Sequence, residues 1–200
     1  NFVFVGTSGA PEASSKCTDS GSNPVSPTPQ QIVVPDPQRS VMEKPYIVID
    51  RSGKYTLITP KAKTGQRGVQ WGAGADDAYS DGFENVFVAV PTDSVGVINS
   101  KLSAGLHVIL TPGVYQLSEP IRLGQSTSFP YQVLLGLGLP TLVPMHGGAA
   151  VEVHDGGAGV RVAGILLQAG QVTSQALITV GVSSTAQWDA SNPILLADVY

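Results

Sequence analysis

The feature that most constrains this chain is the close spacing of its short apolar runs after Gly105. The stretch GLHVILTPGVYQLSEPIRLG, residues 105–124, holds three such runs, separated by a Pro-Gly pair and a Glu-Pro pair. Runs of this kind recur to residue 200, and Gly, Pro, Asn or Ser stands in nearly every gap. The gaps are too short for the crossover helices of a doubly wound parallel sheet, so that fold is excluded.

Short strands with two apolar sides and tight corners are typical of a solenoid, in which each coil stacks on its neighbour. An antiparallel sandwich would show a cleaner apolar/polar alternation and hairpin turns such as Asn-Gly, which this part of the sequence lacks. Residues 107–110, 114–117 and 120–123 therefore predict one turn of a three-sided β-helix: a strand, a corner, a second strand, another corner and a third strand.

One amphipathic helix is expected before the first coil, over residues 92–104. Thr92 or Asp93 can cap its first turn, and Gly105 stands where a glycine ends a helix. Val95, Ile98 and Leu102 share one face of this helix, at the spacing i, i+3, i+7. We expect the helix to cover the open end of the solenoid, which would otherwise expose unpaired strand edges.

The preceding region, residues 1–91, is predicted to be β-rich and irregular. It contains a Ser/Pro/Gly-rich loop over residues 7–31, followed by strands at 45–51, 54–60 and 85–91. Ser52-Gly53 between two of these strands predicts a two-residue hairpin turn. The expected domains are thus residues 1–91 and residues 92–200, the second holding the helix and the first coils.

Charge and cysteine content limit the class of protein. Charged residues make up only 13% of the chain and the formal net charge is −4, which argues against nucleic acid as a partner. No apolar run is long enough to span a bilayer. Cys17, the single cysteine, is either a free thiol or half of a disulfide whose partner lies outside these residues. This composition favours a secreted protein.

Three motifs resemble a known family. These are D-S-x-x-x-I-N-x-x-L from residue 93, G-x-x-V-x-L-T-P-G-x-Y-x-L-S-x-P-I from residue 105, and V-L-L-G-L-G-x-x-T-L from residue 133. Together they resemble the first coils of the pectate-lyase superfamily of right-handed parallel β-helices, in the branch of glycoside hydrolase family 55, the β-1,3-glucanases. The resemblance covers about residues 85–200. It implies an all-β, right-handed parallel β-helix, but this fold carries many activities.

Strand parity gives the first candidate site. Residues 151–155 read VEVHD. If Val151 and Val153 face inward, Glu152 and His154 face outward, because successive side chains of a strand alternate. Asp155 follows directly. Arg161 and Arg122 lie between apolar neighbours in the same way. If these strands stack in register, the polar residues share one outer face that can bind or hydrolyse a sugar polymer. The alternative is an ordinary solvated face.

A second candidate lies near residue 200, where Asp189 and Asp198 form an acidic pair and Trp188 can stack on a sugar ring or simply cover the core. The candidate catalytic residues are Glu152, Asp155 and Asp198. The candidate substrate-binding residues are Arg122, His154, Arg161, Trp188 and Asp189.

His107 opens a strand and is expected to be structural. No metal site is assigned, although an irregular Ca²⁺ site is conceivable among four acidic residues: Asp76, Asp77, Asp81 and Glu84.

The function that these patterns favour is a secreted carbohydrate-active enzyme, a glycoside hydrolase that cleaves a β-glucan-like polysaccharide with two carboxyl groups. Two alternatives stay open: a non-catalytic extracellular structural or adhesive β-helix, and a polysaccharide lyase. The last residues, SNPILLADVY, show no polar cap. We therefore expect further coils beyond residue 200, or contacts with another chain, and catalytic carboxylates that lie mostly in that part.

Overall fold

The computed structural model describes residues 2–3, 32–33, 40–65, 77–125, 131–154, 157–181, 189 and 191–200. The chain forms two compact units. The first consists of residues 1–43 and 61–78, and the second of residues 44–60 and 79–200. The predicted boundary at residue 91 stays a prediction, as do the predicted further coils.

In the described part of the first unit, two short strands pair in parallel: β1 (Phe2–Val3) and β2 (Ile32–Val33). Val41 forms an antiparallel bridge with Lys63. The ammonium of Lys63 lies 3.3 Å from the carboxylate of Asp77.

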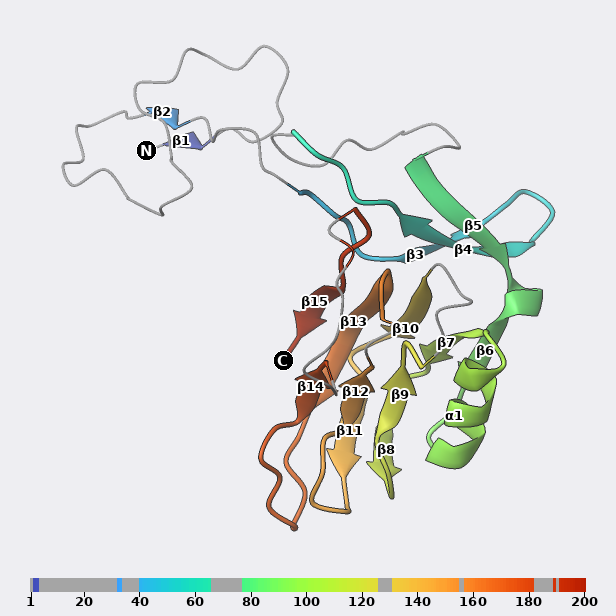
Figure 1. Ribbon diagram of the computed structural model, residues 1–200. Helices are drawn as coiled ribbons and strands as arrows, with labels where there is room; N and C mark the ends of the chain where they lie inside the picture. Colours follow the sequence, from blue (N-terminus) through green and yellow to red (C-terminus); the bar gives the residue numbers. More distant parts are fainter. Residues whose placement is uncertain are drawn as a thin grey trace. The chain divides into compact units, whose positions relative to one another are not determined.

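The second unit is built on three stacks of parallel strands (Figure 1). The first stack holds, in order of pairing, β6 (Val86–Ala89), β7 (His107–Leu110), β10 (Gln132–Gly136), β13 (Val160–Leu167) and β15 (Leu195–Val199). The second holds β8 (Val114–Leu117), β11 (Thr141–Pro144) and the end of β13. The third holds β9 (Ile121–Leu123), β12 (Val151–Val153) and β14 (Ile178–Val180). The prediction of an all-β fold with parallel sheets is confirmed.

The register repeats from coil to coil. Val151 in β12 lies between Ile121 of β9 and Ile178 of β14. From β7 onward, each parallel pair is connected through the other two stacks, because the chain visits β7, β8 and β9 before it returns as β10 beside β7. This route explains how these strands pair in parallel without crossover helices.

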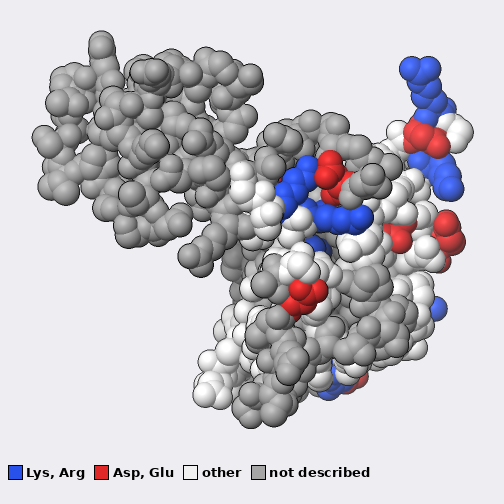
Figure 2. Space-filling model, turned by 45° about the horizontal axis from the view of Figure 1, so that its top comes forward, with Lys and Arg blue, Asp and Glu red and all other residues white. Residues whose placement is uncertain are grey.

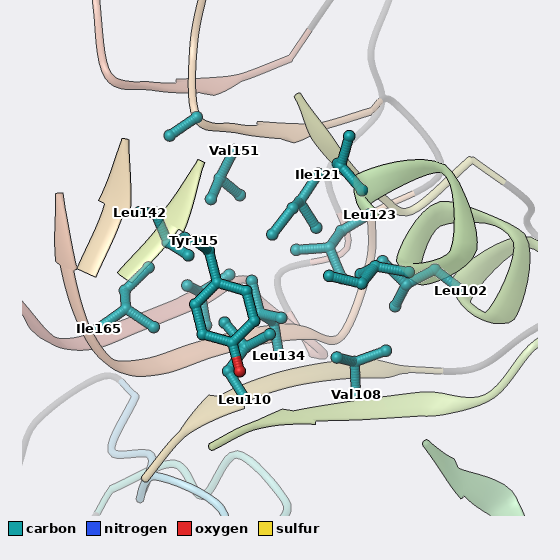
Figure 3. Packing of buried hydrophobic residues seen from close by; sticks show 14 of the residues in the cluster. Leu102, Val108, Leu110, Tyr115, Ile121, Leu123, Leu134, Leu142, Val151 and Ile165 are labelled. Carbon is teal, nitrogen blue, oxygen red and sulfur yellow. The ribbon is translucent and has the colours of Figure 1, made fainter. Parts of the chain in front are cut away.

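The interior between the stacks is a continuous apolar core (Figure 3). Tyr115, Leu134 and Val151 come from three different stacks and are each at most 1% exposed. The Tyr115 hydroxyl donates to the Ala89 carbonyl oxygen at 2.9 Å, so the one polar group of this ring is satisfied. The inward positions of successive coils thus meet in one core, as the apolar runs predicted.

At one corner two glycines of adjacent coils touch. β13 pairs with β10 through Ala163 and with β11 from Leu166 onward, so the chain turns between these residues, at Gly164. Gly164 has a φ of +69°, and a Cβ placed there would lie 2.6 Å from the carbonyl oxygen of Gly136. Only glycine meets both requirements without strain.

The predicted helix is present as α1 (Val95–Ser103), and its predicted apolar face is buried. Val95, Ile98 and Leu102 all belong to the apolar core. The predicted cap at Thr92 or Asp93 was wrong. Ser94 is the N-cap and accepts from Val97 N–H, whereas the Asp93 carboxylate accepts from Val90 N–H. No helix among the described residues is long and apolar enough to cross a bilayer.

A second layer packs on the outer side of the first stack. It is a three-stranded sheet in the order β3 (Tyr46–Ile49), β4 (Tyr55–Pro60) and β5 (Ala78–Gly82), followed by the 3₁₀ helix η2 (Phe83–Asn85). Leu57 of β4 is fully buried in a cluster with Ile109 and Val133. The outer face of the first stack is therefore largely covered.

The hairpin between β3 and β4 is present, but its predicted two-residue turn was wrong. Asp50 and Lys54 still pair, since Asp50 N–H donates to the Lys54 carbonyl oxygen at 3.0 Å. Three residues lie between them, and the last, Gly53, has a φ of +83°. The Asp50 carboxylate accepts from the N–H of Ser52 and of Lys54, which stabilises the longer loop.

Candidate functional site

The third stack brings three of the predicted residues together on its outer face. Strand register places Glu152 of β12 directly beside Arg122 of β9. Their side chains approach to 3.7 Å, between Glu152 Oε2 and Arg122 Nε, and His154 Nε2 lies 3.7 Å from the same carboxylate. These three side chains are 27–30% exposed. The predicted shared face is thus present for Arg122, Glu152 and His154.

The sequence reasoning missed a second carboxylate on this face. Glu119, in the turn before β9, forms an ion pair with Arg122. Arg122 therefore joins two carboxylates, those of Glu119 and Glu152. The spacing Glu119-x-x-Arg122 across a tight corner could have suggested this pair. We call these four residues, Glu119, Arg122, Glu152 and His154, the outer-face cluster.

The cluster is held in place from the helix. The side-chain oxygen of Asn99 accepts from Arg122 N–H at 2.9 Å, and its amide donates to the Pro120 carbonyl oxygen at 2.9 Å. Thr179 of β14 lies beside Glu152 on the next coil. The face thus offers carboxylates, a guanidinium, an imidazole and a hydroxyl, all groups that can exchange hydrogen bonds with sugar hydroxyls.

Arg161 does not share this face, and its predicted exposure was wrong. Its parity is as predicted, opposite to Val160 and Val162 of the core. However, it lies in the first stack, whose outer side is covered, and it is fully buried. Its guanidinium donates to the Pro193 carbonyl oxygen at 2.7 Å and to Asn192 Oδ1 at 3.2 Å. Burial lowers its pKa to about 10. Arg161 thereby fixes the turn that precedes β15.

A half-buried polar cluster under β5 was also missed as a unit. Asp81 accepts from the Tyr131 hydroxyl and lies 3.3 Å from His107 Nε2. The Tyr131 ring stacks on His107 and on Tyr79, with centroids 4.9 and 4.0 Å apart. Burial lowers the pKa of His107 and, together with the Asp81 hydrogen bond, raises the pKa of Tyr131. His107 is structural, as expected from its place at a strand start.

The acidic pair near residue 200 serves two separate local roles. The exposed carboxylate of Asp189 accepts from the hydroxyl and the N–H of Ser191, and these hydrogen bonds lower its pKa. Asp198 has a φ of +50° and forms an ion pair with Lys44. It lies in β15, in a different sheet from Glu152, so these two predicted catalytic carboxylates do not share a face. Asp155 and Trp188 lie outside the described residues, as does Cys17.

Asp198 borders a pocket of about 360 Å³ at the glycine corner of the first stack. Its lining consists of Lys44, Gly136, Gly138, Leu139, Gly164, Asp198 and Tyr200. This volume is at the lower end of the ~300–1,000 Å³ typical of small-molecule sites.

Of the four acidic residues considered for Ca²⁺, two have other partners and one lies outside the described part. Asp77 pairs with Lys63, Asp81 contacts Tyr131 and His107, and Asp76 is among the residues that the structure does not describe. Over the described ranges, no group of three or more His, Cys, Asp or Glu side chains is arranged to hold a metal ion. Basic and acidic side chains lie close to each other on the face shown in Figure 2.

Comparison with known proteins adds a relative with a named activity. Over 158 residues, 79% of this chain, the sequence is 37% identical to a protein named exo-beta-1,3-glucanase from Streptomyces sp. (strain SirexAA-E / ActE). The structure of sacteLam55A from Streptomyces sp. SirexAA-E superposes over the whole chain with a TM-score of 0.77 and 34% identity. A variant of sacteLam55A in complex with glucose gives the same TM-score at 33% identity.

The match extends over only part of these relatives. The chain covers 25% of the glucanase sequence and 33% of each solved chain. The family described as the LAM55 pectate lyase-like domain matches residues 86–200, which is more than half of the chain and contains all three stacks and α1. The chain therefore belongs to the LAM55 pectate lyase-like domain family.

Proposed function

We propose that the protein to which this chain belongs is a glycoside hydrolase that releases glucose from β-1,3-glucan. The observation that carries this proposal is the 37% identity to an exo-beta-1,3-glucanase across 79% of the chain. The match of a glucose complex of sacteLam55A to the same fold supports it. In this proposal the chain contributes one part of the enzyme, because it spans a quarter to a third of those relatives.

The finer features of the fold belong to the same proposal. The coils wind right-handed, as in the superfamily that the motifs resemble, and α1 caps the solenoid. The burial of Val95, Ile98 and Leu102 in the core supports the capping role. The domain boundary lies near residue 91, and further coils follow residue 200. The protein acts outside the cell, because a polymeric glucan cannot cross a membrane.

Within this chain, the outer-face cluster is proposed to contact the glucan. Glu119 and Glu152 both pair with Arg122, so the cluster suits binding of hydroxyl groups. Hydrolysis needs two carboxyl groups about 5–10 Å apart, one acting as acid and one as base or nucleophile. Glu152 and Asp198 lie in different sheets, and Glu119 and Glu152 are both paired with Arg122, so we propose that at least one carboxyl group of the catalytic pair comes from outside the described residues. Asp155 is one candidate in this chain, and Trp188 beside Asp189 stays a candidate for binding.

The proposal is tested with the full-length protein on three polymers: a β-1,3-glucan, a β-1,4-glucan and polygalacturonate. We expect reducing sugar from the β-1,3-glucan at a rate at least about tenfold above the other two. Preferential cleavage of polygalacturonate, or no cleavage of any polymer by a folded preparation, would reject it.

The role of the outer-face cluster is tested separately by Glu152→Gln. This change keeps the shape of the side chain but removes its charge. We expect weaker binding of the β-1,3-glucan and a change in stability under ~0.5 kcal/mol, as is usual at surfaces. Glu84→Gln, the same change at an exposed position in η2, is the matched control. Equal binding by the two variants would assign the cluster to an ordinary solvated face.

A further inference from the structure

The pocket at the glycine corner has a floor made of bare backbone. Gly136 and Gly164 lie on adjacent coils, and a Cβ on either one would come within 2.2–2.6 Å of the carbonyl oxygen of the other. No larger side chain can stand at either position. The hollow is therefore fixed by strand stacking and does not depend on a side chain swinging aside.

Backbone strain is concentrated at the rim of this pocket. Among the described residues, Leu139 and Asp198 alone have a positive φ without being glycine, at +55° and +50°. Both line the pocket. Aspartate tolerates this conformation, but leucine rarely adopts it. Strained residues of this kind tend to gather at ligand sites, where the fold imposes them for a function.

The rim also has the chemistry of a site for an uncharged polar ring. Asp198 and Lys44 form an ion pair there, so one positive and one negative charge cancel while both groups still offer hydrogen bonds. Tyr200 lines the pocket and Leu139 is 45% exposed, which adds an aromatic and an aliphatic surface. An aromatic face beside paired polar groups matches a pyranose, which has an apolar face and a rim of hydroxyls.

We propose that this pocket binds one neutral sugar residue of a β-glucan chain, distinct from the outer-face cluster on the third stack. Tyr200 and Leu139 contact the apolar face of the sugar, and Asp198 and Lys44 exchange hydrogen bonds with its hydroxyls. A polyuronate fits less well, because the net charge of the rim gives its carboxylates no attraction. The identity of the sugar as glucose rests on the proposed function, whereas the pocket and its preference for a neutral ring do not.

The test is photo-crosslinking of the full-length protein with a β-1,3-linked glucose trisaccharide that carries a diazirine. Mass spectrometry then maps the labelled peptides. We expect labelling of the peptides that contain residues 136–139 and 198–200. Tyr200→Ala and Asp198→Asn each reduce this labelling about tenfold, the equivalent of 1.4 kcal/mol. Tyr55→Ala removes an exposed tyrosine elsewhere and leaves it unchanged. Labelling confined to other peptides, or equal in all variants, would overturn the proposal.

Two further measurements keep the conclusions separate. Excess tri-galacturonate should not compete with the probe, and competition equal to that of unlabelled glucotriose would overturn the preference for a neutral ring. Glucose release from β-1,3-glucan is assayed on the same preparations. Labelling of the pocket without glucose release rejects the proposed enzyme and leaves the binding site. Glucose release without labelling of the pocket rejects the binding site and leaves the proposed enzyme.

Leu139→Gly tests whether the strain serves binding. Glycine relieves the ~1–2 kcal/mol cost of the left-handed conformation, which exceeds the ~0.5–1 kcal/mol of extra entropy that glycine loses on folding, so the variant should have a higher Tm than the natural chain. It also removes an apolar wall, so labelling at residues 198–200 should fall several-fold. A structural role alone would not lower labelling while stability rises. A higher Tm with undiminished labelling would overturn the role of Leu139 in the site.

Discussion

At the scale of single residues, His107 links the packing of the second layer to pH. Val133 N–H donates to His107 Nδ1 at 3.3 Å, so the neutral ring carries its proton on Nε2, toward Asp81. The ring of Tyr131 stacks on the imidazole, and the carboxylate of Asp81 lies beside its Nε2. Protonation of Nδ1 would break the backbone hydrogen bond, and burial already lowers the pKa of His107 below 6.5.

The first prediction follows from this shift. Above pH 6.5, His107 is neutral in both the folded and the unfolded chain, so its contribution to stability is complete. As the pH falls below 6.5, only the unfolded chain takes up the proton, and the free energy of unfolding decreases by at most about 1.4 kcal/mol per pH unit. The loss ends once the pH passes the lower, folded-state pKa. Urea denaturation at a series of pH values measures this change in the free energy of unfolding.

Two variants assign the effect. His107→Gln can still accept from Val133 N–H but does not titrate, so the slope below pH 6.5 should flatten. Val97→Ala, at an exposed position of α1 without a titratable group, is the control and should keep the slope. If His107→Gln retains the full slope, another group is responsible. Hydrogen bonds lower the pKa values of Asp50 and Asp189 from their ordinary 3.8, so their contribution to stability is lost only below about pH 5 and does not affect the slope between about pH 5 and 6.5.

The second prediction concerns the glycine corner. Gly164→Ala places a Cβ 2.6 Å from a backbone oxygen at a φ of +69°, so it adds a clash to the strain. Gly53 also has a positive φ, +83°, but a Cβ added there would have no atom within 4 Å. We expect Gly53→Ala to cost about 1–2 kcal/mol and Gly164→Ala clearly more. Thermal unfolding of both variants measures the two losses of stability. Equal losses would show that the coils do not stack through this contact.

Single residues also show what the sequence could predict. Parity placed Arg161 on the correct side of its strand, because alternation along a strand is a local property. Its burial depends on partners about 30 residues away in sequence, Asn192 and Pro193, which no local pattern announces. The same holds for Asp81, whose partner Tyr131 is 50 residues away. Arg122 and Glu152 were matched because consecutive coils repeat one register.

At the scale of elements, local patterns located α1 and the strands well. Gly, Pro, Asn and Ser between short apolar runs marked the corners, and each run after Gly105 forms a strand or part of one. The helix began later than predicted, because Asp93 accepts from Val90 N–H in the preceding turn and leaves Ser94 as the cap. Such competition between neighbouring acceptors is decided by backbone geometry, which composition does not reveal.

The third prediction tests the packing of α1. Ile98 is fully buried, so Ile98→Asp places an unpaired charge in the core and should lower stability by at least about 3 kcal/mol. Val97→Asp is the matched control, since Val97 is on the same helix and 42% exposed. Its effect should stay below about 1 kcal/mol. Chemical denaturation measures both, and equal losses would contradict the assignment of the buried face.

At the scale of the whole molecule, each coil contributes one strand to each stack, so stability is close to a sum over neighbouring coils. A fold of this kind places its outer faces independently of its core. The outer-face cluster and the glycine-corner pocket can therefore vary while Tyr115, Leu134 and Val151 stay in contact. This separation explains why the fold was predictable from apolar spacing, whereas the polymer and its linkage were not.

The most direct test of the central claim is the first product that the full-length protein releases from a β-1,3-glucan. Chromatography of samples taken at low conversion identifies it. The relationship to an exo-beta-1,3-glucanase predicts glucose as the main early product, with the polymer shortened only slowly. Early oligosaccharides of mixed length would contradict the release of single residues. An unsaturated sugar would identify a lyase, and an unchanged polymer would indicate a non-catalytic β-helix.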